Sequence, residues 1–353
     1  MAINIIIAIV ILLLSVNIIL NNIIEGGQYT NNYSFVNRAC TDSLKGFAIV
    51  MIAIAHICQY DVSLKKTLIG GSISYSLLFS WGAIGVSLFF LLSGYGCYLS
   101  ISRQDNYRGW IVKHVLKMLI HFICAFILVI SVNIALFGAK YDYKDLFINI
   151  VTLRLPGSTV WYFKIQILFY IILTISMTIS RKNASIIVLA MSLIYAIIAN
   201  YCFNLPDYWW KTALCFPFGC MGGQYKNKAV RFTTRILVKI CIIFVGCIAY
   251  ILIMKDNHYR IALQLLGYVY ISVCITVFWD WVFNQGSRIF GIMGKASLDL
   301  YLIHIGYVEI VLSLNYNKDL LIVLFMCLTG VTTFLCYHLS ELINKRAEDC
   351  LLS

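Results

Sequence analysis

Charged residues and proline are both scarce in this chain of 353 residues. Asp, Glu, Lys and Arg together make up 12% of the sequence, and only 3 residues are proline. Soluble domains contain roughly 25% charged residues. Hydrophobic residues, in contrast, make up 61% of the chain. The composition therefore excludes an ordinary soluble enzyme, and the lack of polar low-complexity sequence excludes a disordered chain.

Motifs for metal or nucleic-acid binding are also lacking. The 13 cysteines form no Cys-x-x-Cys pair and no Cys/His cluster with zinc spacing. We therefore expect no metal site, and we assign the cysteines to helix packing. The net charge of +12 comes from basic residues between apolar runs, as the positive-inside rule requires of cytoplasmic loops. With no nucleic-acid-binding motif beside them, these residues do not indicate nucleic acid as a partner.

Long apolar runs dominate what remains. Because roughly 20 apolar residues cross the bilayer core, the runs between charged or turn residues predict an all-α fold, a polytopic transmembrane helix bundle of about ten to eleven spans. The expected spans are 2–24, 44–60, 75–101, 114–137, 161–180, 184–203, 212–225, 236–254, 261–283, 296–314 and 319–340. The weakest is 212–225, which is short and rich in glycine.

The distribution of lysine and arginine predicts the orientation of these spans. The richer side is expected to be cytoplasmic, which places the C-terminus in the cytoplasm. The expected location is the plasma (inner) membrane, crossed many times. Residues 1–30 are expected to be an extra N-terminal transmembrane helix that is retained, because they lack a positive n-region and a small-residue cleavage site. Residues 31–345 form the membrane domain. Residues 346–353 form a short cytoplasmic tail, so we expect no appended soluble catalytic domain.

Ionisable residues inside the spans are candidate functional residues, because a charge in hydrocarbon is costly. His56 lies eleven positions after Lys45, about 16 Å and close to three full turns along a helix. The two side chains therefore share nearly one face. An imidazole can serve as a general base, and the alternative is a structural histidine hydrogen-bonded between helices. In a later span, His304 and Glu309 are poorly spaced for mutual contact, but His304 could reach a neighbouring helix.

Three further segments each allow two interpretations. Ser93, Gly94 and Tyr95 either permit close helix packing or interrupt a helix. The basic stretch 103–117 either binds phosphate groups or serves topology and lipid headgroups. Trp161 opens a span with an aromatic cluster that an interfacial aromatic belt would also explain.

Several of these motifs follow one another in a fixed order between about residues 38 and 310. They are Asp42, Lys45-Gly46 and His56; Gly82, Gly85, Val86, Phe89, Phe90 and Ser93-Gly94-Tyr95; the basic stretch 103–117; Trp161-Tyr162-Phe163; Phe216-Pro217-Phe218-Gly219; and Ser297-Leu298, Tyr301-Leu302 and His304. In this order the chain resembles the acyltransferase 3 family of integral membrane acyltransferases, which modify cell-surface glycans and other extracytoplasmic acceptors. It departs from the family's pattern where lysines replace arginines.

The resemblance implies an O-acetyltransferase-like enzyme. It would move an acyl group, with acetyl expected, from cytoplasmic acyl-CoA to a hydroxyl of a cell-surface or lipid-linked carbohydrate. His56 would be the general base or would carry the acyl group, with Lys45 and Asp42 as the other catalytic residues. Acyl-CoA would be a co-substrate, with no bound cofactor. The residues implied to bind it are Arg38, Arg103, Arg108, Lys113 and Lys117. The residues implied to line the substrate pocket are Ser93, Tyr95, Trp161, His304 and Glu309.

The main alternative is a transporter or flippase for a lipid-linked sugar. Such a protein would share the many helices, the sparse intramembrane charge and the glycine-rich segments, and inverted repeats would favour it. We find no such repeat in the sequence. The lipid bilayer is an expected partner in either case, and a homo-oligomer is compatible with the sequence.

Overall fold

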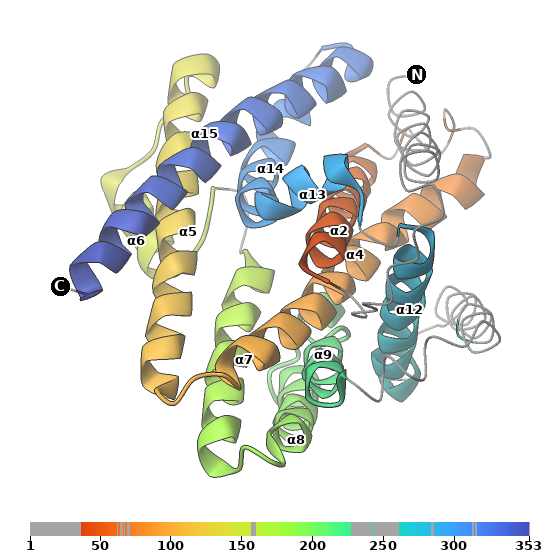
Figure 1. Ribbon diagram of the computed structural model, residues 1–353. Helices are drawn as coiled ribbons and strands as arrows, with labels where there is room; N and C mark the ends of the chain where they lie inside the picture. The colour runs from red at the N-terminus through yellow and green to blue at the C-terminus, as the bar shows by residue number, and fades with distance from the viewer. Residues whose placement is uncertain are drawn as a thin grey trace, which may run out of the picture.

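The computed structural model describes residues 37–352, except 62, 64, 65, 67, 69, 70, 157–159, 227–241, 243–260, 284, 285, 313 and 315. Within these ranges every regular element is a helix (Figure 1). The predicted all-α class is thereby confirmed. The expected helix in residues 1–30 and nearly all of the 236–254 window lie outside the described residues.

Long helices account for most of the described chain. They are α2 (Arg38–Tyr60), α4 (Gly71–Ile101), α5 (Tyr107–Phe137), α7 (Trp161–Ile179), α8 (Ala184–Ile197), α12 (Ile261–Val282), α14 (Ser297–Leu312) and α15 (Lys318–Leu352). The shorter elements are α6 (Tyr143–Val151), η1 (Ile198–Cys202), η2 (Asp207–Trp209), α9 (Cys215–Gln224) and α13 (Arg288–Lys295).

By length and composition, seven helices of the described chain can cross a membrane, with η1 extending α8. Helices α13 and α14 pass the same test as a pair, bent by 72° at their junction, which gives up to eight. The 212–225 window holds only the ten-residue α9, too short to span a bilayer. The chain is thus a multi-pass membrane protein, and the expected number of ten to eleven spans is not confirmed.

Glycines allow the helices around α2 and α4 to pack backbone against backbone. A Cβ on Gly46 of α2 would collide with the carbonyl of Phe290 on α13, and a Cβ on Gly294 would collide with the carbonyl of Asp42. Helix α13 lies against α2 in Figure 1. Gly94 of α4 and Gly219 of α9 make the same kind of close approach. The packing interpretation of Ser93-Gly94-Tyr95 is therefore confirmed, since α4 continues unbroken through it.

Gly94→Ala is expected to lower the free energy of unfolding by about 1–3 kcal/mol or more. The added methyl group would collide with the Phe216 carbonyl on α9. Thermal unfolding in detergent, followed by gel filtration, measures the effect. Gly96→Ala on the same helix is the matched control, because a Cβ there meets nothing within 4 Å. Equal stability of the two variants would contradict the close packing of α9 on α4.

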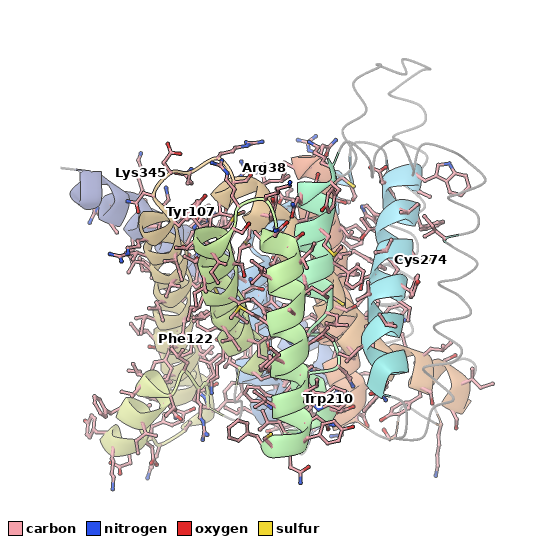
Figure 2. The ribbon with its side chains drawn as sticks, turned by 90° about the horizontal axis from the view of Figure 1, so that it is seen from below. Arg38, Tyr107, Phe122, Trp210, Cys274 and Lys345 are labelled. Carbon is pink, nitrogen blue, oxygen red and sulfur yellow. The ribbon has the colours of Figure 1, made fainter. Side chains whose placement is uncertain are left out.

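The bundle has two chemically different ends. In Figure 2, Arg38, Tyr107 and Lys345 lie at one end, which we call the basic end, and Trp210 lies at the opposite end. Trp161, Tyr208 and Trp209 join Trp210 there, since the ring of Trp161 lies 5.5 Å from that of Tyr208 and 6.4 Å from that of Trp209. We call this the aromatic end.

Candidate active site

Two histidines from distant parts of the chain meet in the bundle. Nε2 of His304 on α14 lies 3.0 Å from Nδ1 of His56 on α2, and the two rings stack with centroids 5.1 Å apart. His304 is fully buried and His56 is partly buried. The structure therefore joins a histidine implied to be catalytic with one implied to line the substrate pocket.

The backbone fixes which nitrogen of each ring carries a proton. Nδ1 of His304 lies 2.8 Å from the carbonyl oxygen of Leu300, and a carbonyl can only accept a hydrogen bond. Nδ1 of His304 is thus the donor, and in a neutral ring Nε2 accepts. It follows that His56 donates from Nδ1 and that its own Nε2 keeps a free lone pair. This tautomer, assigned from the hydrogen-bond geometry, makes His56 Nε2 the basic atom of the pair.

Polar side chains on the facing sides of α4 and α7 form a polar lane, which comprises Ser93, Cys97, Tyr162, Gln166 and Tyr170. The Tyr162 hydroxyl donates to Oε1 of Gln166 over 3.4 Å and lies within hydrogen-bonding reach of Ser93. Tyr170 makes similar contacts with Gln166 and Cys97. Of these five residues, sequence reasoning singled out only Ser93 as a pocket residue. The four-residue spacing of Tyr162, Gln166 and Tyr170 along one helix face was the signal that could have identified these three residues of α7.

Aromatic rings connect the polar lane to the histidine pair. The ring of Tyr162 lies 5.2 Å from that of Tyr301, whose ring lies 5.7 Å from that of His304. On the other side, Tyr162 lies 6.5 Å from Trp161 at the aromatic end. Three consecutive ring contacts therefore connect the aromatic end to the histidine pair.

Lys45 and Asp42 lie on the same helix as His56 but not beside it. Asp42 is 3.9 Å from both Arg38 and Lys45, which gives two long ion pairs at the start of α2. Along α2, Lys45 is about 16 Å from His56. Of the three residues implied to be catalytic, Asp42 and Lys45 therefore lie at the basic end, whereas His56 lies far along α2 from them.

The remaining cations of the basic stretch lie around the start of α5. Arg103, Arg108 and Lys113 are exposed, and Tyr107 marks this segment at the basic end in Figure 2. Lys117 is also exposed, and its Nζ lies 2.8 Å from a carboxylate oxygen of Glu341 on α15. Arg38 and the exposed cations thus lie at the same end of the bundle, and the charge of Lys117 is neutralised by Glu341.

The other implied pocket residues lie apart from the histidines or outside the description. Tyr95 packs against Gly222 of α9, with 3.7 Å between the tyrosine ring and a Cβ placed on the glycine. Trp161 belongs to the aromatic end. The side chain of Glu309 lies outside the described residues.

A second buried polar cluster ties three helices together. Nδ1 of His121 on α5 lies 2.7 Å from Oδ1 of Asp299 on α14 and 2.9 Å from the Ser340 hydroxyl on α15. Cys336 lies 3.2 Å from the same carboxylate oxygen. Nothing in the sequence indicated that His121 and Asp299 would be partners. The cluster holds α14 in place one to two turns before His304. Within the described part of the chain, no group of His, Cys, Asp and Glu could hold a metal ion.

The fold and the histidine pair together define the class of protein. Long apolar helices that enclose two histidines indicate an integral membrane protein with an ionisable site inside the helix bundle. A family model described as an acyltransferase domain then matches residues 38–341. The chain therefore belongs to the acyltransferase 3 family and is a membrane acyltransferase, which confirms the resemblance in the sequence. No curated protein and no solved structure matches the chain.

Proposed function

We propose that the chain transfers an acyl group, acetyl in the expected case, from acyl-CoA to a hydroxyl of a cell-surface or lipid-linked carbohydrate. The observation that carries this proposal is the His56–His304 pair. Its hydrogen bonds leave Nε2 of His56 as a base in a largely apolar bundle, where an acceptor hydroxyl could lose its proton during attack.

The proposed step is a direct transfer. Nε2 of His56 takes the proton of the acceptor hydroxyl while the acceptor oxygen bonds to the thioester carbonyl carbon. The carbon–sulfur bond then breaks, and the sulfur of CoA takes the proton back from His56. The products are the ester and free CoA thiol, and His56 returns to its starting state.

The donor would bind at the basic end. Arg38, Arg103, Arg108 and Lys113 offer exposed cations for its phosphate groups, and Lys45 lies at the same end of α2. The thioester would then have to reach about 16 Å along α2 to His56. The polar lane provides hydrogen-bonding groups for this passage.

The acceptor would enter from the aromatic end. Trp161, Tyr208 and Trp209 present partly exposed rings, which can cover the apolar faces of a sugar. Arg154 and Lys164 have no ion-pair partner in the described ranges and would suit a glycan that carries a phosphate or carboxylate. We propose that the aromatic end is extracytoplasmic and the basic end, with Lys345, cytoplasmic, in the plasma (inner) membrane.

Radiolabelled acetyl-CoA tests this function. Membranes from cells that carry the chain are expected to transfer the label to carbohydrate and to release CoA thiol in equal amounts, whereas membranes from deletion cells are not. A parallel assay with labelled succinyl-CoA tests succinyl as the transferred acyl group. If neither acyl group reaches carbohydrate, the proposed function is wrong. Movement of a lipid-linked sugar without thiol release would support the transporter alternative instead.

A further inference from the structure

The hydroxyl of Tyr301 is buried, and no described residue accepts a hydrogen bond from it. The side chain is 2% exposed, and its oxygen has no partner among the described residues. Burying an unpaired hydroxyl is costly, and nearby tyrosines avoid that cost. Tyr162 donates to Gln166, and Tyr307, two turns further along α14, lies 3.0 Å from the Thr332 hydroxyl.

The position of this hydroxyl links it to the histidine pair. Tyr301 precedes His304 by three residues on α14, so the two side chains share one face of the helix, with ring centroids 5.7 Å apart. The backbone N–H of Tyr162, in the first turn of α7, approaches the phenol oxygen. An N–H can only donate, so within the described part of the chain the phenol proton is still without an acceptor.

A buried donor beside a base suits one chemical demand of acyl transfer. When an alcohol attacks a thioester, negative charge develops on the carbonyl oxygen, and a preorganised donor in a water-poor site stabilises that charge most effectively. Packing does not require the hydroxyl, because phenylalanine would fill the same space and leave no phenol proton without an acceptor.

We propose that the Tyr301 hydroxyl donates a hydrogen bond to the acyl carbonyl oxygen of the thioester. This inference rests on the proposed function and adds a second catalytic group to it. As the acceptor oxygen bonds to the carbonyl carbon, the carbonyl oxygen becomes negative, and the Tyr301 proton stays on the phenol. When the carbon–sulfur bond breaks, the carbonyl re-forms and the sulfur takes the proton held by His56.

The test compares Tyr301→Phe with Tyr307→Phe, each of which removes one buried hydroxyl from α14. Tyr301→Phe is expected to lower the maximal rate of acetyl transfer from labelled acetyl-CoA by about 10²–10³-fold. The KM for acetyl-CoA should be unchanged, because the interaction is made only in the transition state. Its unfolding temperature should not fall. Tyr307→Phe should show the reverse, with unchanged transfer and a lower unfolding temperature, because it loses a satisfied hydrogen bond.

A wild-type transfer rate in Tyr301→Phe would overturn this inference while leaving the proposed function intact. Failure of the wild-type chain to transfer any acyl group would instead overturn the proposed function. If Tyr301→Phe accumulates poorly, 3-fluorotyrosine at position 301 keeps the hydroxyl and makes it a stronger donor. A changed maximal rate would then support the inference, and an unchanged rate would overturn it.

Discussion

Replacing His56 by glutamine is expected to lower acetyl transfer by about 10²–10⁴-fold, the range that a positioned general base contributes. The glutamine amide can still donate to Nε2 of His304, so the contact between α2 and α14 is kept while the basic nitrogen is lost. The measurement is label transfer from acetyl-CoA to carbohydrate in membranes, normalised to the amount of chain present.

His338→Gln is the matched control for this variant. His338 is an exposed histidine on α15, whose ring contacts Phe334 and Tyr337 and no described residue of the proposed site. It should keep the wild-type rate. Undiminished transfer in His56→Gln at normal protein level would remove His56 from the mechanism and with it the observation on which the proposed function depends.

Replacing His304 by leucine is expected to reduce transfer by up to about 10⁴-fold, the loss that follows when a catalytic histidine is no longer held in its correct tautomer. Leucine offers no acceptor for the Nδ1 proton of His56, so the imidazole can rotate and move its proton to Nε2, where it blocks the base. His304 thus acts as a positioning residue, since it works through His56.

His304→Gln distinguishes positioning from simple packing. Its side-chain oxygen can accept the Nδ1 proton of His56, so this variant should recover part of the activity that His304→Leu loses. Equal losses in the two variants, with normal unfolding temperatures, would contradict the tautomer assignment. Transfer assays with labelled acetyl-CoA on equal amounts of each chain make this comparison.

The sequence singled out both histidines of the pair but could not predict that they meet. The eleven-residue spacing of Lys45 and His56 is a local property, and the structure confirms that both lie on the continuous helix α2. His304 is 248 positions further along the chain. Because these helices are apolar on most faces, periodicity does not indicate which faces meet. For the same reason, the contact between His121 and Asp299 could not be predicted from the sequence.

The spans were predicted well where a helix is long and less well where glycine dominates. The windows at 75–101 and 161–180 closely match α4 and α7. The 212–225 window was apolar enough to suggest a span, but its glycines serve close packing of the short α9 on α4. The bend between α13 and α14 was missed because α13 is short and less apolar than a span.

The glycine contacts of α2 and α4 also bear on how this protein can change over generations. Where main chains touch, as at Gly46 and Gly294, almost any replacement would be rejected, so α2, which carries His56, and the adjoining α13 have little freedom to vary. The segment that carries Tyr208 and Trp209 contacts Trp161 through side-chain rings, and connecting segments of this kind tolerate replacement more readily. Under the proposed function, a lineage could therefore adopt a new acceptor by altering that segment while its acyl-transfer chemistry stayed the same.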